Sequence, residues 1–418
     1  MDAFYESVAY AIVAIPIVTI AISLMKKYWR ERLDALRATN FAKFKHILLE
    51  IKIPRELDRG PAAMEAVLNY LHQTGGESTW YDVRFLGKTR PWFSFEICAI
   101  NGRVHFFIWT REVWKKHVER SIYAQYPTVE ISEVDDYTFG WEYDPNTIEA
   151  WGIHQTLSKP DAYPIKTYVD YGLDKADQEE TNKIDPFSNL IEMLGSFGKD
   201  EQLWVQILVR GHKKIGSSDS WEDAAKSEID KIIKSRKETG FQLTKEDNET
   251  ITALRRSISK PGFDCGIRIL HFAKKEVFNG MNNPALIGMF KMFNSGSLNG
   301  FKPAGGMTVF DYWWQDRSGK KAYGVKKDLF AWYKQRSYFY PPHASNDSTK
   351  SNFKELIKKT FPVLEKNWFL KNHEGGDSFV LNTEELATIY HFPTGTTQTP
   401  TFERVQSRKA EAPANLPL

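Results

Sequence analysis

The sequence is poor in cysteine and has no strong excess of either charge. Only Cys98 and Cys265 occur among its 418 residues, which excludes a disulfide scaffold and a cysteine-only metal cluster. The formal net charge is +3, from 56 basic and 53 acidic residues. So small a surplus gives no electrostatic case for strong nucleic-acid binding. We therefore expect a protein of a reducing compartment without strong direct affinity for DNA or RNA.

The chain also lacks the short motifs that carry common chemistries. It has no G-x-x-x-x-G-K-[ST] phosphate loop, no G-x-S-x-G elbow and no H-E-x-x-H or H-x-x-x-H pair among its ten histidines. Its nearest glycine cluster, Pro303-Ala304-Gly305-Gly306, lacks the lysine of a phosphate loop. We therefore predict no catalytic, cofactor-binding or metal-binding residues, and we expect that the chain is not an enzyme.

One long uncharged segment lies near the amino terminus. The 18 residues Val8–Met25 are almost wholly apolar, and as a helix they would reach about 27 Å, close to the roughly 30 Å hydrocarbon core of a bilayer. We predict a single transmembrane helix here, in which Pro16 is tolerated as it is in membrane helices. The predicted anchor residues are Val8, Ile12, Pro16, Ile20 and Leu24.

Basic residues follow the apolar segment and set the expected orientation. By the positive-inside rule they place the body in the cytoplasm and the short amino terminus outside, in the cytoplasmic (inner) membrane. A cleavable signal peptide would instead carry basic residues before the segment, where Asp2 and Glu6 stand. A buried core helix is the other alternative. The predicted topology-setting residues are Lys26, Lys27, Arg30 and Arg32.

After an anchor and linker over residues 1–40, the hydrophobic pattern predicts a β-α-β-β-α-β unit over residues 41–139, the ferredoxin-like arrangement. Asn101-Gly102 is a hairpin signal between its two central strands. The expected strands are 44–54, 93–99, 104–108 and 128–134, and the expected helices begin at Pro61 and near Arg111.

The same order recurs over residues 140–312, so the predicted fold class is α+β with two ferredoxin-like copies. The expected first strand is Ile165–Tyr171, the central strands are Leu203–Arg210 and Gly266–Lys274, and the helices begin at Asp185-Pro186 and Asn283-Pro284. A charged insertion, 211–261, separates the central strands. Its apolar stripe indicates a helical hairpin lying on its own domain or, alternatively, a partner-binding arm. An aromatic-rich helical region, 313–381, and an extended tail, 382–418, complete the predicted domains.

The end of the chain resembles a known pattern. Residues 379–393 read FVLNTEELATIYHFP, then come Thr399-Pro400 and VQSRKAEAPANLP at 405–417. These residues resemble a segment of type IV secretion-like proteins of bacteria and archaea. Shorter segments that resemble the same family are 91–97, 104–108, 122–127, 258–263 and 267–269.

The resemblance implies that, in this family, a membrane-anchored module of two ferredoxin-like copies precedes a conjugation-type ATPase domain. This sequence departs from the pattern because it stops where the motor would begin. We therefore predict a non-catalytic, membrane-anchored component of a type IV secretion- or conjugation-like DNA-translocation apparatus. It would be a scaffold or docking partner for a separate hexameric ATPase. Two alternatives stay open: the amino-terminal half of a longer motor, or a membrane-bound enzyme with an unrecognised site between the copies.

The tail is the predicted meeting point with the ATPase. Asn382 followed by Glu385 is a capping box that opens a short helix, but the proline-rich remainder cannot bury a core of its own. We expect the tail to gain order across the second copy or across the ATPase, and removal of residues after Leu381 to leave folding intact. Oligomeric state, a homo-oligomer included, is left open. The predicted docking residues are Asn382, Glu385, Leu386, Ile389, Tyr390, His391 and Pro393.

Overall fold

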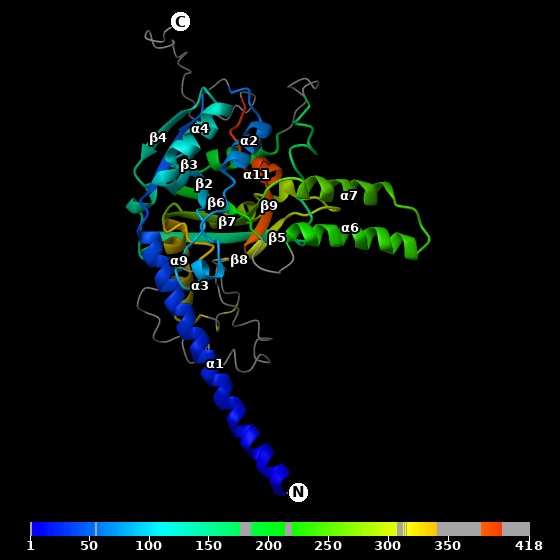
Figure 1. Ribbon diagram of the computed structural model, residues 1–418. Coiled ribbons are helices and arrows are strands. Elements are labelled where there is room, and N and C mark those ends of the chain that lie inside the picture. The colour runs from blue at the N-terminus through cyan, green and yellow to red at the C-terminus, as the bar shows by residue number, and fades with distance from the viewer. Residues whose placement is uncertain are drawn as a thin grey trace, which may run out of the picture.

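A single antiparallel sheet of nine strands forms the centre of the computed structural model (Figure 1). The structure describes residues 2–54, 57–175, 185–213, 220–306, 312, 314, 316–340 and 378–394, with backbone alone for 2–17, 19 and 305–306. The strands are β1 (His46–Lys52), β2 (Phe93–Ile100), β3 (Arg103–Arg111), β4 (Glu130–Val134), β5 (Ile148–Leu157), β6 (Glu201–Gly211), β7 (Gly262–Lys274), β8 (Phe301–Gly306) and β9 (Phe379–Asn382).

Helices of very different lengths connect these strands. The α-helices are α1 (Asp2–Ala42), α2 (Pro61–Leu71), α3 (Trp80–Arg84), α4 (Lys115–Gln125), α5 (Phe187–Gly195), α6 (Trp221–Glu238), α7 (Lys245–Ile258), α8 (Asn283–Ile287), α9 (Lys320–Lys334) and α11 (Thr383–Ile389). The short 3-10 helices are η1 (Glu112–Trp114), η2 (Tyr137–Gly140), η4 (Gly280–Asn282) and η5 (Lys291–Phe293). The predicted α+β class is thus confirmed.

The strand order shows how the two halves of the chain meet. Across the sheet the order is β4-β1-β3-β2-β6-β7-β5-β8, and β9 pairs with β7 off this path. The halves join where β2 pairs with β6, from Phe93 opposite Val209 to Ile100 opposite Gln202. Pairing removes what would otherwise be an exposed edge on each half. The sequence pattern predicts β2 and β6 but not this joint, because a strand's own residues do not reveal its neighbour.

The first strand of the second half lies elsewhere than predicted. Residues 165–167 are irregular and 168–171 form a turn, and β5 (Ile148–Leu157) pairs with β7 and β8 instead. Ile165 and Thr167 are buried and so mimic a strand's alternation. Their backbone N–H groups donate to the side chains of Glu385 and Asp170, at 2.8 and 2.9 Å. Periodic burial therefore arises here without a ladder of backbone hydrogen bonds.

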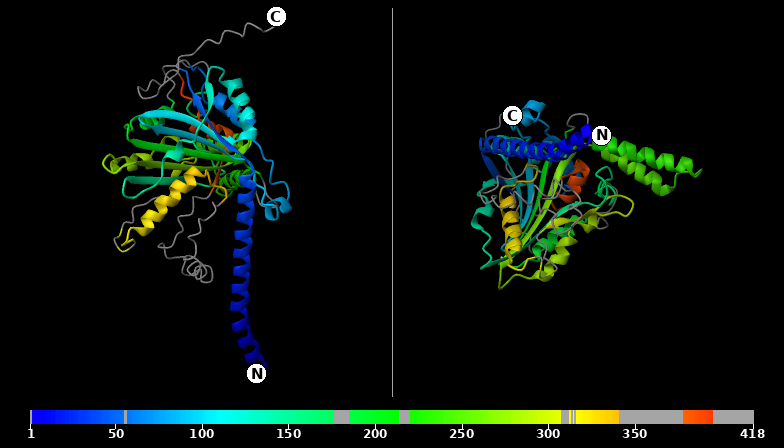
Figure 2. Two further views of the ribbon diagram at one scale, coloured as in Figure 1. Left: turned by 90° about the vertical axis from the view of Figure 1, so that its left-hand side faces the viewer. Right: turned by 90° about the horizontal axis from the view of Figure 1, so that it is seen from below.

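The sheet separates two apolar layers (Figure 2). On one face α2, α4, α5 and α11 cover a large core that draws on both halves of the sheet. On the other face α9 packs through Leu329, Phe330 and Tyr333 against Trp204 and Phe272. α9 lies in the predicted aromatic-rich helical region, 313–381, of which residues 313, 315 and 341–377 lie outside the described part of the chain.

The amino-terminal helix α1 projects away from the body (Figures 1 and 2). Its last turns rest on the segment around α3, where Trp29 meets Phe85 edge-on at 5.3 Å and Asn40 donates to the carbonyl of Leu86. Searched over the described residues, the helices contain no stretch long and apolar enough for a membrane crossing. The predicted transmembrane helix therefore gains no support from them.

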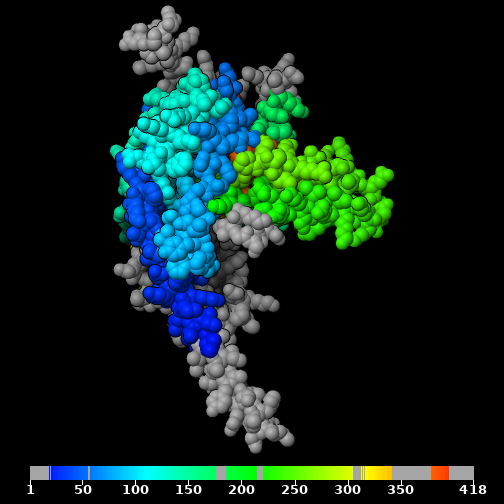
Figure 3. Space-filling model, viewed as in Figure 1, coloured from blue at the N-terminus to red at the C-terminus, as the bar shows by residue number. Residues whose placement is uncertain are grey.

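The charged insertion forms an arm of two helices, α6 and α7, that extends sideways from the body (Figure 3). Ala225 and Ile229 of α6 pack against Ile251 and Leu254 of α7, and Ala162 closes this small core. Each helix begins with a capping box. The apolar stripe thus holds the two helices of the hairpin together, and the arm extends from the body instead of lying along it.

Candidate functional site

The most strongly built polar site surrounds the segment 378–394, which we call the strap. β9 of the strap pairs with β7 from Gly262 opposite Asn382 to Cys265 opposite Phe379. This occupies the stretch of β7 that β5, which pairs with residues 267–274, leaves free. α11 then lies against α2 on the covered face of the sheet. The strap is therefore an inner part of the fold.

A capping box starts α11, as the sequence predicts. Asn382 accepts from the backbone N–H of Glu385 at 2.9 Å, and Glu385 accepts in return from the N–H of Asn382 at 2.9 Å. The second oxygen of Glu385 accepts from the N–H of Ile165 at 2.8 Å. Complete burial raises the pKa of Glu385 to about 8, although these two donors act in the opposite direction. One side chain thus caps α11 and holds the loop before residue 170.

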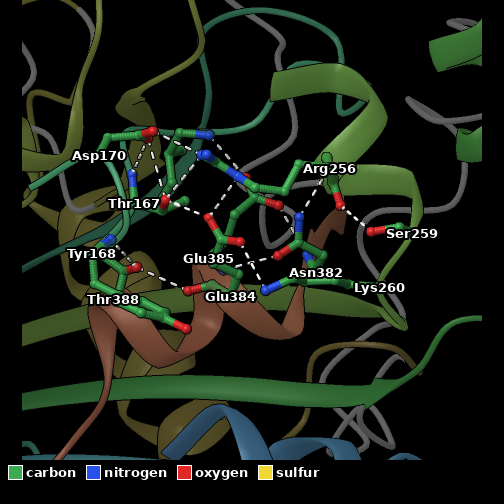
Figure 4. A network of polar contacts seen from close by, with 12 residues as sticks. Thr167, Tyr168, Asp170, Arg256, Ser259, Lys260, Asn382, Glu384, Glu385 and Thr388 are labelled. Atoms are coloured by element: carbon green, nitrogen blue, oxygen red, sulfur yellow. Dashed lines mark hydrogen bonds and ion pairs between the residues drawn. The ribbon is translucent and has the colours of Figure 1, made fainter. Parts of the chain in front are cut away.

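Next to the capping box, an ion-pair network that we call the strap lock joins the strap to α2 and α7 (Figure 4). Glu384 is 2% exposed and contacts Arg256 Nε at 3.2 Å and Lys260 Nζ at 2.8 Å. Lys260 Nζ also lies 2.6 Å from Glu65 of α2. Burial lowers the pKa of Lys260, but the carboxylates of Glu384 and Glu65 outweigh this effect and raise that pKa overall. Three segments far apart in sequence therefore share one buried charge system.

The loop at 165–170 completes the strap lock. Arg256 donates to Asp170 at 2.7 Å, and Thr167 donates its hydroxyl hydrogen to Glu384. The N–H of Tyr168 donates to Thr388 of α11 at 2.9 Å. The side chains of the loop, α7 and α11 converge in Figure 4. Since Glu384 is almost inaccessible, a missing partner would leave charge in the interior, which is costly.

The end of the strap packs against the first half of the chain. His391 Nε2 lies 2.9 Å from Asp185, and Phe392 meets Tyr126, which follows α4, at 4.9 Å between ring centroids. Burial raises the pKa of Asp185, but the imidazole of His391 outweighs this and holds that pKa below its usual value. The strap thus contacts elements of both halves.

A second buried network lies on the opposite face of the sheet and fastens the chain after α9. Glu96 is fully buried and accepts from Arg336 Nε at 3.0 Å, from Ser94 at 2.7 Å and from Tyr137 at 2.7 Å. Arg336 also pairs with Asp136. The charges in this network are paired as they are in the strap lock.

The chemistry of both networks suits fastening. The carboxylates that form them contact arginine or lysine, or accept from backbone and hydroxyl donors. Within the described ranges no cluster of three or more His, Cys, Asp or Glu side chains could hold a metal ion. The arrangement can hold segments together through charge, and a change of charge can release them.

The structure buries the predicted docking residues. Of the seven predicted docking residues, Pro393 is buried and the other six have an exposed fraction of at most 2%. The expectation that this segment offers a surface to a partner is therefore wrong for the described conformation. Of the two surfaces considered for it, the strap lies on the chain's own body. The physical reason is that its apolar side chains fill the core, while Glu384 pairs with basic side chains and Glu385 accepts from backbone N–H groups. The seven are Asn382, Glu385, Leu386, Ile389, Tyr390, His391 and Pro393.

The predicted anchor and topology residues all belong to α1. Ile20 and Leu24 are 41% and 53% exposed. The side chains of Val8, Ile12 and Pro16 lie outside the described residues. The basic residues follow on the same helix, where Lys27 lies 3.7 Å from Glu31 and Arg32 stacks over Trp29 at 5.4 Å. The remaining two, Lys26 and Arg30, are exposed.

Sequence reasoning missed most of the strap lock. Its members Glu65, Thr167, Arg256, Lys260 and Glu384 stand at scattered positions that no local motif unites. Two signals were present: Glu65 stands on the apolar face of α2 beside Met64, and Lys260 lies in the family-like segment 258–263. A charged residue on an apolar helix face calls for a buried partner.

Comparison with known families gives one match. Residues 25–305, about two thirds of the chain, match the family described as "Domain of unknown function (DUF8128)". The chain belongs to this family. The DUF8128 region contains Glu65, Arg256 and Lys260 of the strap lock, whereas the strap lies beyond it. No curated protein matches the chain.

Proposed function

We propose that this chain is a membrane-anchored, non-catalytic scaffold of a type IV secretion- or conjugation-like DNA-translocation apparatus, working beside a separate ATPase. α1 carries the anchor and the body lies in the cytoplasm. The observation that carries the proposal is the projecting helix α1, whose apolar side chains Val18, Ile20, Ile22, Leu24 and Met25 are 41–65% exposed. Such exposed apolar side chains on an isolated helix need an apolar environment.

The anchor extends beyond the residues whose side chains are described. The uncharged run starts at Ser7, and basic residues follow it from Lys26 onward. This order supports insertion with the body on the cytoplasmic side. We infer further that the two halves are ferredoxin-like copies. The strand orders β4-β1-β3-β2 and β8-β5-β7-β6 support this. In each half the four strands lie in the sheet in the order fourth, first, third and second along the chain.

The burial of the strap moves the proposed ATPase contact along the chain. Phe392 lies against Tyr126 after α4, and α4 lies at the end of the body opposite α1 in Figure 1. The strap therefore ends on the side of the body that faces away from the proposed membrane. We propose that residues 395–418, with their family-like basic run, meet the ATPase there. The strap lock would hold the chain at its exit point.

Membrane insertion is tested by placing charge in the apolar run. The double variant Ile12→Arg, Ile20→Arg should move the protein from the membrane pellet to the alkaline-extractable fraction. The matched variant Ile12→Leu, Ile20→Leu should stay in the pellet. Equal extraction of both would contradict the anchor. Replacement of Lys26, Lys27, Arg30 and Arg32 by Gln should make the body accessible to external protease in part of the population.

The ATPase contact is tested by truncation after Thr394. Full chain and truncated chain are cross-linked in cells, and the captured proteins are identified by mass spectrometry. The proposal expects an ATPase with a phosphate loop on the full chain and its loss from the truncated chain. Both chains should unfold at the same temperature. Retention of the ATPase at full yield on the truncated chain would contradict the role of 395–418.

A further inference from the structure

A shallow hollow lies at the end of the sheet where β1 and β2 begin and β3 ends. Its volume is about 420 Å³, and its walls include Phe44, Gly76, Thr89 and Trp114. Gly76 has φ +111°, and a Cβ there would stand 2.8 Å from the carbonyl oxygen of Thr89. Glycine thus lets the loop after α2 lie close to the segment before β2 that carries Thr89. The volume is typical of small-ligand sites.

Arg111, the last residue of β3, lines this hollow and is poorly satisfied. It is 7% exposed. Among described residues its guanidinium makes one hydrogen bond, from Nη2 to Thr89 at 3.1 Å, and lies over the rings of Phe44 and Trp92, at 4.1 and 5.9 Å from their centroids. Its Nε is buried without a partner. A guanidinium carries five N–H donors, so most of its capacity is unused.

The other three buried arginines have more acceptors than Arg111, although Nε of Arg268 is also buried without a described partner. Arg90 contacts Glu77 and Asp264, and Arg336 contacts Glu96 and Asp136. Arg268 has no carboxylate but donates to three oxygen acceptors at 2.6–2.9 Å. Arg111 alone among these four has a single hydroxyl as its acceptor in the described part of the chain. A buried cation without an anion is costly.

No described acid faces Arg111 from the elements packed against it. The adjacent Glu112 is directed to Lys45, with Oε1 at 2.7 Å from Nζ. The carboxylate of Asp82 in the nearby helix α3 pairs with Lys88 at 2.7 Å. Burial lowers the pKa of Arg111, as expected for a cation that lacks a carboxylate. The charge at this end of the sheet is therefore positive and uncompensated by described residues.

We propose that this hollow binds a small soluble organic anion, a phosphate monoester or carboxylate that carries an aromatic or aliphatic group. The anionic group would pair with Arg111 and Thr89. Its apolar group would lie against Trp114 and Phe44. Arginine binds carboxylate and phosphate oxygens with matched pairs of donors. Such a ligand supplies both the acceptors and the apolar contact that the hollow lacks.

The choice of a soluble ligand over a lipid headgroup rests on the proposed function. If the apolar run ends at Met25, the helical residues up to Ala42 span about 25 Å at about 1.5 Å per residue. Phe44 and the hollow lie just beyond that end of α1. The hollow is thus out of reach of the headgroups of the membrane that holds α1.

Calorimetric titration of the full chain in neutral detergent tests the proposal with phenyl phosphate, benzoate, inorganic phosphate and the cation benzylamine. Phenyl phosphate or benzoate should bind at least fivefold more tightly than inorganic phosphate, and benzylamine should not bind. Arg111→Gln should weaken binding at least tenfold, whereas Arg255→Gln, on the exposed side of α7, should not change it. Absence of organic-anion binding to the wild type, or equal binding by Arg111→Gln, overturns the proposal.

A second pair of variants covers the case in which Arg111→Gln fails to fold. Val113 is 75% exposed at the rim of the hollow. Val113→Glu should weaken binding at least threefold by repulsion, and Val113→Gln should leave it unchanged; equal binding by the two contradicts the site.

In nanodiscs, replacing phosphatidylcholine with phosphatidylglycerol should leave the affinity for phenyl phosphate unchanged. If phosphatidylglycerol competes with phenyl phosphate for the wild type, and Arg111→Gln abolishes this competition, then the hollow binds a lipid headgroup. That result would overturn the soluble-ligand proposal. Binding in detergent with failed membrane insertion would refute the anchor alone.

Discussion

The helix α1 and the strap both contain apolar side chains that need burial, yet those of α1 are exposed in the structure and those of the strap are buried. α1 projects from the body with Ile20 and Leu24 exposed, whereas Leu386 and Ile389 of the strap are at most 2% exposed. The difference lies in what accompanies the apolar residues. The strap carries one carboxylate, Glu384, that contacts both Arg256 and Lys260. Apolar content therefore indicates that a segment needs to be buried, while its charged residues indicate which surface it packs against.

Truncation gives the largest expected effect and separates the two segments most clearly. Ending the chain after Leu381 removes buried Leu386, Ile389, Tyr390 and Phe392. Each contributes about 1.5–3 kcal/mol, against a total stability of about 5–15 kcal/mol. This truncation should therefore unfold the body, contrary to the expectation from sequence.

A matched truncation provides the control. A chain that ends after Thr394 keeps the whole strap and should show the wild-type unfolding transition by circular dichroism. A chain ending after Leu381 that still unfolds cooperatively at the wild-type temperature would show that the strap is not part of the core.

Breaking the strap lock at one residue should have the next largest effect. Lys260→Met leaves Glu384, which is 2% exposed, with one basic partner fewer and Glu65 without its lysine. Breaking a buried pair costs about 3–5 kcal/mol; because the Lys260 side chain is 23% exposed, we expect about 2–3 kcal/mol. The exposed pair of Lys231 and Glu228 on α6 is the control. Lys231→Met should change the free energy of unfolding by less than about 0.5 kcal/mol in a urea titration, and equal losses would contradict the lock.

The strap also shows how far sequence reasoning reaches. The capping box of Asn382 and Glu385 is local, and the sequence predicts it correctly. The fate of α11 depends on Glu65, Thr167 and Lys260, which are distant in sequence, and no local pattern reveals that convergence. The same limit applies to the joint between β2 and β6 and to Arg111. An arginine at a strand end looks solvated until the fold shows that it is 7% exposed.

The pH dependence of stability gives a smaller and more specific effect. Because burial raises the pKa of Glu385 to about 8, the folded state holds a proton that the unfolded chain loses near pH 4.5. Its stabilising contribution is therefore complete below about pH 4.5 and disappears as the pH rises to about 8. The slope is at most about 1.4 kcal/mol per pH unit.

The variant Glu385→Gln isolates this contribution. It should remove part of the fall in stability between pH 5 and 8 when unfolding is followed by urea titration at several pH values. Asp247→Asn is the control, because the hydrogen bond with Arg236 lowers the pKa of Asp247 to about 2, below the tested range. Parallel profiles for wild type and Glu385→Gln would mean that Glu385 is ionised throughout.

The smallest expected effect concerns α1 and completes the comparison. Leu24 is 53% exposed, so Leu24→Ala removes little buried area and should change the unfolding free energy of the body by less than about 0.5 kcal/mol. Leu386→Ala, the matched change in the strap, should cost about 2–5 kcal/mol because that side chain is 2% exposed. Urea titration of the two variants in neutral detergent measures the difference directly. A large loss for Leu24→Ala would show that α1 packs on the body in solution, and the exposed helix could then no longer support the proposed anchor.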